Sequence, residues 1–234
     1  MVKVSVIIPT YNRFKYLLNA IESVVNQTHK DIEVIVVNDC STEEEYYSFD
    51  FNSKFGEKLR IIHLDKNTKK MFGKGAPGYV RIFGIKVSNG EYIAFLDDDD
   101  IWFATKLEKQ LSAMNQNNCE MSSTEGLIGN KRERYNKDKK YKRYLGQNFF
   151  NHLQKIYKNH NIDLKNGFPK IWDQNFIKIH NCMITSSVII KKEILEKVNY
   201  MDNRPYGEDW FCWKKCLEYT KSVYLDDDVY FYYA

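Results

Sequence analysis

The sequence predicts an α/β fold with a mostly parallel central sheet flanked by helices. Four short apolar runs, rich in β-branched residues, are typical of buried strands: residues 4–8, 32–37, 59–64 and 92–96. Segments with apolar residues at helical spacing separate them, and strands alternating with helices over short connections favour parallel pairing. Polar clusters follow three of the strands, at residues 9–13, 38–42 and 97–100. Because parallel strands end at one edge of a sheet, these clusters should gather there.

The elements of the first half follow in order. Strand 4–8 stops at Pro9, and the next helix shows its apolar face at Leu17, Leu18, Ile21, Val24 and Val25. Strand 32–37 precedes an acidic run at 43–45, which suggests a helix capped by Ser41 or Thr42. Strand 59–64 is followed by a predicted helix over 77–88, with Pro77 in its first turn. Strand 92–96 runs into four consecutive aspartates, and Leu107, Leu111 and Met114 then mark a further helix.

The pattern is weaker after residue 118. Helices are expected around 145–158, 191–198 and 207–219, and strands at 188–190 and 229–233. Neither an internal repeat nor a linker divides the chain, so a single domain over 1–234 is expected.

Composition and charge exclude several classes of protein. Five scattered cysteines without a CxxC motif predict reduced thiols, and the longest apolar runs fall short of the ~18 residues of a membrane-spanning helix. A cytoplasmic protein is expected, and peripheral contact with a membrane is compatible with this. The net charge of +4 arises from residues 131–143, which carry eight Lys/Arg and two Asp/Glu. The rest of the chain is not basic, which disfavours nucleic-acid binding. The basic stretch is either a solvated loop or a contact for an anionic partner.

The run Asp97 to Asp100 at the end of a buried strand predicts a cation site. Adjacent carboxylates repel one another unless a cation neutralises them, and carboxylate oxygens suit Mg²⁺ or Mn²⁺. The alternative is that these residues, Asp100 in particular, cap a helix that begins near Trp102.

Five segments together resemble family 2 glycosyltransferases with the GT-A fold: residues 4–13, 36–42, 91–102, 186–192 and 207–210. The similarity is close over 3–110 and looser over 183–233. It implies a Rossmann-like sheet, with a nucleotide-sugar-binding half at 1–118 and a variable acceptor-side half at 119–234. Three positions depart from the family pattern, with Asn38 for a common Asp, Cys40 for a common Gly and Phe83 for a common Asn.

The resemblance also implies roles for individual residues. Pro9, Thr10, Tyr11 and Arg13 would form the nucleotide loop, with Tyr11 packing on the base. Asp39 would bond to the base, consistent with uracil, and Arg81 would lie near the nucleotide. Asp97 would hold the ribose and the neighbouring phosphate region, and Asp98 would bind the donor beside it. Asp99, with Asp97, would ligate the metal. Asp209 would be the catalytic base, with Glu208 beside it; from the pattern alone, Asp209 is equally well an acid at the start of a helix.

The implied activity is inverting transfer of a sugar from a nucleotide diphosphate donor, expected to be a UDP-sugar, with Mn²⁺ or Mg²⁺. The acceptor would be a hydroxyl of a glycan, a lipid-linked sugar or a protein. A catalytically silent nucleotide-sugar-binding module is the main alternative. Residues 73–78 fit the GxGxxG pattern of dinucleotide-binding oxidoreductases, but these glycines do not directly follow a predicted strand. Residues 66–78 are therefore expected to form a flexible loop near the donor.

Overall fold

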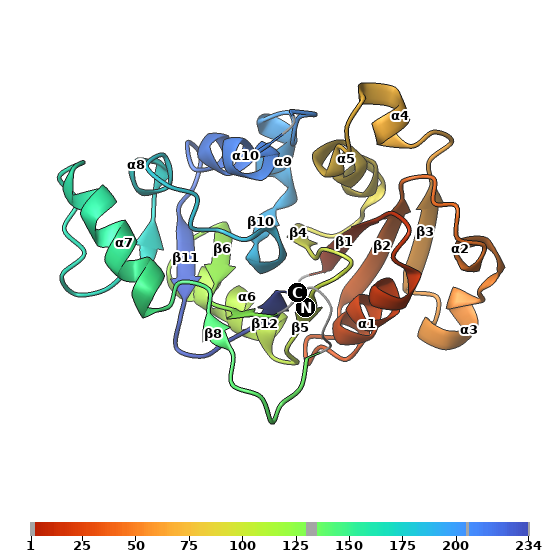
Figure 1. The fold of residues 1–234 in the computed structure, drawn as a ribbon, viewed down its shortest axis with the longest axis horizontal. Helices are drawn as coiled ribbons and strands as arrows, with labels where there is room; N and C mark the ends of the chain where they lie inside the picture. The colour runs from red at the N-terminus through yellow and green to blue at the C-terminus, as the bar shows by residue number, and fades with distance from the viewer. Residues whose placement is uncertain (1–2, 130–134, 205, 234) are drawn as a thin grey trace.

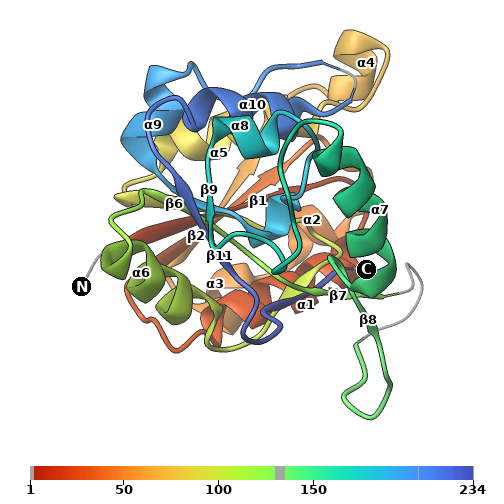
Figure 2. The same ribbon diagram turned by 90° about the vertical axis from the view of Figure 1, so that its left-hand side faces the viewer.

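The protein, described by a computed structural model, has a central sheet between two layers of helices. The structure describes residues 3–129, 135–204 and 206–233. In Figure 1, α5, α8, α9 and α10 lie above the sheet, and α1, α3 and α6 lie below it. Figure 2 shows the same three layers from the side. The arrangement confirms the predicted α/β class.

The strands are β1 (Val4–Thr10), β2 (Ile32–Asn38), β3 (Leu59–His63), β4 (Tyr92–Phe95), β5 (Ile101–Trp102), β6 (Met121–Thr124), β7 (Leu127–Ile128), β8 (Lys142–Arg143), β9 (Ile171–Trp172), β10 (Ile189–Lys191), β11 (Ser222–Leu225) and β12 (Phe231–Tyr233). The α-helices are α1 (Phe14–Val25), α2 (Glu45–Ser48), α3 (Phe51–Phe55), α4 (Thr68–Phe72), α5 (Pro77–Val87), α6 (Lys106–Gln116), α7 (Gln147–Lys158), α8 (Gln174–Ile177), α9 (Lys192–Lys197) and α10 (Glu208–Cys216). A short 3-10 helix, η1, spans Thr185–Ser187.

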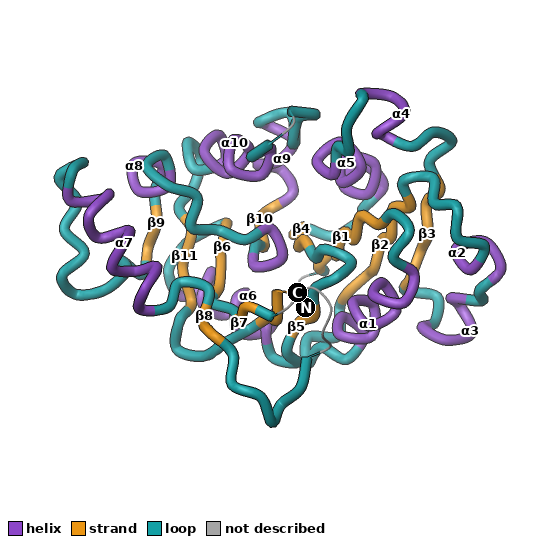
Figure 3. The backbone as a smooth tube through the Cα atoms, in the orientation of Figure 1, coloured by secondary structure: helices purple, strands orange, loops and turns teal. Residues whose placement is uncertain are grey.

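The main sheet has the strand order β3-β2-β1-β4-β10-β6-β11-β9 (Figure 3). The first four strands are parallel, as predicted. β10 runs antiparallel to both of its neighbours, so the sheet is mixed where the sequence pattern weakens. The strand order reverses direction between β1 and β4, and open α/β sheets bind ligands at such a switch point.

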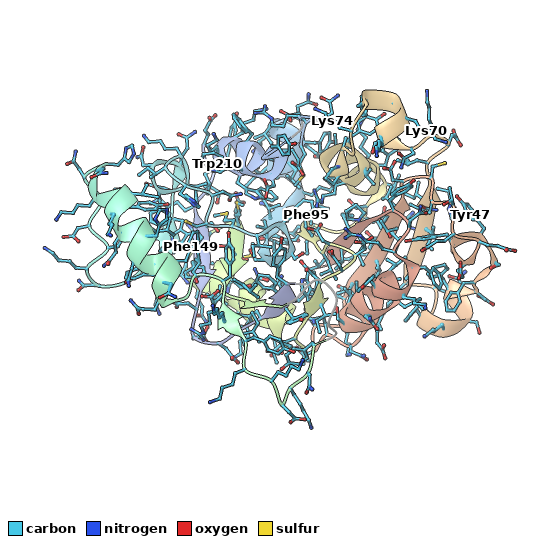
Figure 4. The ribbon with its side chains drawn as sticks, viewed as in Figure 1. Tyr47, Lys70, Lys74, Phe95, Phe149 and Trp210 are labelled. Carbon is cyan, nitrogen blue, oxygen red and sulfur yellow. The ribbon has the colours of Figure 1, made fainter. Side chains whose placement is uncertain are left out.

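Alternate residues of the strands face two separate cores. In β1, Ile7 packs with α5 and α10 above the sheet, whereas Val6 and Ile8 pack with α1 below it. Phe95 of β4 lies in the interior against Trp213 of α10, with ring centroids 5.4 Å apart, whereas Tyr47 lies at the outer edge (Figure 4). Burial on both faces is the reason that these strands read as continuous apolar runs in the sequence.

The expected cap of the second helix is wrong. α2 is a single turn whose N-cap is Glu44, without a side-chain hydrogen bond. Ser41 Oγ instead accepts a hydrogen bond from the backbone N–H of Asn12 at 2.9 Å, and Thr42 also bonds to Asn12. Both residues serve to join two loops rather than to begin a helix.

A second, four-stranded sheet, β5-β12-β7-β8, lies beside the end of β4. The sequence pattern predicts only its strand β12. The basic stretch 131–143 falls in the segment between β7 and β8, and residues 130–134 lie outside the described residues. Tyr135 and Tyr141 pack against Tyr232 of β12, with ring centroids 5.5 Å and 5.1 Å away. No helix in the described part of the chain is long and apolar enough to cross a membrane.

Lys106, in the first turn of α6, is fully buried. Its Nζ donates to Gln110 Oε1 at 2.7 Å and lies 4.0 Å from the centroid of the Trp102 ring. Burial lowers the pKa of Lys106 well below its ordinary value, because removal from water disfavours the charged form.

We therefore predict a pH-dependent effect of Lys106→Met. Between the lowered pKa and about pH 10, the unfolded wild type binds a proton that the folded protein lacks, so wild-type stability rises with pH. The variant lacks this rise, and its stability relative to wild type should be greatest near neutral pH and decline toward pH ~10. Urea denaturation across this range measures the difference. Lys109→Met, which removes an exposed lysine of the same helix, should show no such trend, and parallel pH profiles for wild type and Lys106→Met would contradict the prediction.

Candidate functional site

A cavity of about 480 Å³ lies at the carboxyl ends of β1 and β4, where the strand order reverses. Nine of the residues singled out in the sequence line it: Pro9, Thr10, Tyr11, Arg13, Asp39, Arg81, Asp97, Asp98 and Asp99. They come from four separate segments of the chain. The tertiary structure therefore brings together the predicted nucleotide loop after β1, the loop after β2 and the acidic run after β4.

Side-chain bonds join the loops after β1 and β2. Asn12 lies between them, with its Oδ1 accepting from the backbone N–H of Thr42 at 2.7 Å. Thr10 Oγ1 lies 2.5 Å from the hydroxyl oxygen of Tyr46, which also accepts from the backbone N–H of Arg13. Cys40 adopts φ 55°, a left-handed conformation that favours glycine, the residue common at this position in the resembled family. These bonds hold the backbone of one cavity wall, and Tyr11, 42% exposed, stands on that wall.

Asp39 is buried, and its carboxylate already has partners. It accepts from the backbone N–H and the hydroxyl of Thr68, at 2.8 Å and 2.6 Å, and from Asn67 Nδ2 at 3.1 Å. Burial raises the pKa of Asp39, whereas the Thr68 hydrogen bonds act in the opposite direction. Asp39 thus ties α4 to β2, which brings the segment 67–77 to the cavity.

Ser186 anchors the acidic run. Its Oγ accepts from the backbone N–H of Asp97 at 3.0 Å and donates to Asp100 Oδ2 at 2.5 Å. Trp102 is buried, and its Nε1 donates to the backbone oxygen of Ser186. The helix-capping alternative is wrong, because residues 101–102 form β5 and the next helix, α6, has Thr105 as its N-cap.

Two arginines neutralise the aspartates that face the cavity. Arg81 Nη2 lies 2.5 Å from Asp97 Oδ1, and Arg81 is buried. Arg13 Nη1 lies 2.5 Å from Asp99 Oδ2 and 3.2 Å from Asp98 Oδ1. Burial raises the pKa of Asp98 to about 7, whereas the Thr10 hydroxyl and Arg13 act to lower it. The three aspartates and the two arginines therefore form one cluster of ion pairs beside the cavity.

Arg81 also reaches the start of α10. Its Nη1 lies 3.4 Å from Glu208 Oε1, so one guanidinium joins Asp97 to the predicted catalytic pair. Asp209 Oδ2 accepts from Thr185 Oγ1 at 3.1 Å and from Asn181 Nδ2 at 3.4 Å. Neither Glu208 nor Asp209 is among the residues that line the cavity. Glu208 contacts Arg81, which does line the cavity.

The acidic run fits a divalent cation that takes most of its ligands from a bound diphosphate and water. Among the described residues, no group of three or more His, Cys, Asp or Glu side chains could hold a metal ion by itself. Magnesium commonly binds through one or two carboxylates plus substrate phosphates, and Asp97 and Asp99 supply such a pair. An all-protein metal cage does not fit these residues.

The segment 66–78, expected as a loop near the donor, contains helix α4 and contributes Asn67, Lys69, Gly75, Ala76 and Pro77 to the cavity lining. Two lining residues, Val80 and Tyr233, were missed by sequence analysis. Residues 73–78 follow helix α4 rather than a strand, which agrees with setting aside the dinucleotide fingerprint. Tyr233 reaches the cavity because β12 pairs with β5, directly after the aspartates. Its neighbour Tyr232 lines a second cavity of about 370 Å³, which contains Asp99 as well. Pairing between segments so distant in the chain leaves no local signal.

Gly78 packs closely against the start of α10. A Cβ at this position would lie 2.7 Å from Glu208 Cγ and 2.8 Å from the backbone oxygen of Asp202. We predict that Gly78→Ala destabilises the protein by about 1–3 kcal/mol through overpacking, reduced by the higher helix propensity of alanine. Urea denaturation measures this loss.

Gly75→Ala is the matched control, because a Cβ there meets nothing within 4 Å. Equal stability of the two variants would show that the contact between α5 and α10 is looser than described.

Comparison with known proteins gives one family. The model of glycosyl transferase family 2 matches residues 5–192. A relative from Rickettsia bellii, an uncharacterized glycosyltransferase, is 36% identical over 213 residues, which cover 90% of this chain and 26% of that protein. The chain spans between 19% and 29% of the length of the first three curated relatives it matches.

Two solved structures share the fold. TarS of S. aureus, in complex with UDP-GlcNAc, has a TM-score of 0.67 and 23% identity, covering 98% of this chain and 58% of that one. The mannosyltransferase PcManGT of Pyrobaculum calidifontis, in complex with GDP-Man and Mn²⁺, has a TM-score of 0.67 and 16% identity, covering 98% and 56%. These likenesses confirm the GT-A fold class expected from the sequence.

Proposed function

Because the chain belongs to glycosyl transferase family 2, we propose that it transfers a sugar from a nucleotide diphosphate donor to an acceptor hydroxyl with inversion at the anomeric carbon. The donor is a UDP-sugar, and the acceptor is a hydroxyl of a glycan, a lipid-linked sugar or a protein. The observation that carries the proposal is the 480 Å³ cavity, which combines two tyrosines, two arginines and four aspartates.

The cavity offers complementary groups to each part of a nucleotide diphosphate. Tyr11 is exposed enough to pack on a base, and Arg13 and Lys69 are cations that a diphosphate would attract. Asp99 and Asp97 would hold Mn²⁺ or Mg²⁺, which when bound neutralises the leaving diphosphate. The TarS complex with UDP-GlcNAc and the PcManGT complex with GDP-Man and Mn²⁺ support this choice of ligands.

Asp209 is the proposed base. An acceptor hydroxyl is a weak nucleophile at neutral pH, and a carboxylate can remove its proton as the new bond forms. Thr185 and Asn181 donate to one carboxylate oxygen of Asp209, which fixes the side chain at the start of α10. A single displacement requires this base to act from the side of the sugar opposite the leaving diphosphate, and Arg81 lies between Asp97 and Glu208, the neighbour of Asp209. Glu208 positions Arg81.

We predict that Asp209→Asn lowers the rate of sugar transfer or donor hydrolysis by about 10²–10⁴-fold, the usual worth of a general base. Asparagine keeps an oxygen that accepts from Thr185, so binding of UDP should not change. The rate is measured by release of UDP from UDP-glucose and UDP-GlcNAc in the presence of Mn²⁺.

Glu218→Gln is the control, since it neutralises an exposed carboxylate just past the other end of α10. Equal and low rates for wild type and Asp209→Asn, with UDP still bound, would favour the silent nucleotide-sugar-binding module instead.

We also predict that UDP with Mn²⁺ raises the melting temperature of the wild type. A ligand at one hundred times its Kd stabilises the folded state by ~2.7 kcal/mol. The shift should be smaller for UDP alone, and in Asp99→Ala the addition of Mn²⁺ should not increase the shift that UDP alone gives. A panel with GDP and NAD⁺ tests the choice of base, and stabilisation by NAD⁺ without any response to Mn²⁺ would refute the proposed donor.

A further inference from the structure

We infer that Arg13 is an exchangeable counter-ion of the acidic run: it pairs with Asp99 in the ligand-free protein and passes to the diphosphate when metal and nucleotide arrive together. This inference rests on the proposed function. Arg13 and the metal therefore compete for Asp99. The metal by itself binds weakly, and binding of the nucleotide draws Arg13 away from Asp99.

The two arginines of the site differ in their freedom to move. The Arg81 side chain is 4% exposed and lies between Asp97 and Glu208, so its departure would leave two carboxylates without their cation. The Arg13 side chain also has two carboxylate partners, Asp99 at 2.5 Å and Asp98 at 3.2 Å, but it is 50% exposed. Arg13 can therefore leave its partners and remain solvated, whereas Arg81 cannot.

The backbone of Arg13 is fixed while its side chain is not. Its N–H donates to the Tyr46 hydroxyl at 3.1 Å, and the preceding Asn12 is bonded to the loop after β2. An exchange of partners consequently needs only rotation of the side chain. Pro9, Thr10 and Tyr11 would keep their places in the cavity wall throughout.

Competition follows from the charges. Arg13 Nη1 is 2.5 Å from Asp99 Oδ2. A divalent cation bound to the same carboxylate would be repelled by the positive charge of this guanidinium. A diphosphate offers that guanidinium a bidentate acceptor at least as good as the one it loses. Nucleotide binding thus removes the competitor of the metal, and by linkage the metal strengthens nucleotide binding by the same factor.

The test is the affinity for Mn²⁺ alone, measured by calorimetry on the whole chain without nucleotide. If Arg13 only supported the structure of the site, its replacement would weaken Mn²⁺ binding or leave it unchanged. Arg13→Gln should instead bind Mn²⁺ about three- to tenfold more tightly than wild type, as expected for removal of a partly exposed cation from Asp99. The factor by which UDP increases Mn²⁺ affinity should fall in the same proportion.

Two further variants separate competition from other effects. Arg13→Lys keeps a cation beside Asp99, so its affinity for Mn²⁺ alone should stay near that of wild type. Arg60→Gln removes an equal charge from the edge strand β3, where Arg60 pairs with Glu33 and does not line the cavity, and should leave Mn²⁺ affinity unchanged. Tighter Mn²⁺ binding in Arg60→Gln would mean that net charge alone is responsible.

Unchanged or weaker Mn²⁺ binding in Arg13→Gln, with UDP and Mn²⁺ still binding to wild type, would overturn the exchange and leave the proposed function intact. Absence of any UDP or Mn²⁺ binding to wild type would instead overturn the proposed function itself.

Discussion

The neutralisation of three adjacent carboxylates at the end of β4 is the constraint on which the site depends. Asp97, Asp98 and Asp99 cannot share one turn as charged groups unless cations lie beside them. Arg13 comes from the loop after β1 and Arg81 from α5, so both cations are brought by neighbouring elements of the parallel half of the sheet. Burial raises the pKa of Asp98 to about 7, although Arg13 and the Thr10 hydroxyl act to lower it.

The sheet explains why these groups meet. β1 and β4 are neighbours although 81 residues separate the end of one from the start of the other, and their carboxyl ends form the switch point of the strand order. The mixed second half adds support from behind: Ser186, just before the antiparallel strand β10, holds the acidic run through its hydroxyl. The family 2 match at residues 5–192 spans both the parallel strands and β10.

Arg81 connects the donor side of the site to the predicted base. Its guanidinium contacts Asp97 at the end of β4 and Glu208 at the start of α10, two elements that belong to different halves of the chain. The close contact between Gly78 and Glu208 brings α5 and α10 together at the same place. The resemblance implies two halves, 1–118 and 119–234, and this division remains a prediction. Residues of both halves contribute to the candidate site.

The sequence by itself determined the parallel strands β1 to β4, because burial on both faces forces continuous apolar runs. It also predicted that the polar clusters at 9–13, 38–42 and 97–100 gather at one edge, because loops after such strands share that edge, and the family resemblance added the roles of Tyr11 and Arg13. Only the tertiary structure decided the partners. The pairing of Arg13 with Asp99, the binding of Asp39 by Thr68 and the return of Tyr233 to the cavity join segments far apart in the chain. No local periodicity records such contacts, since they depend on which strand lies beside which.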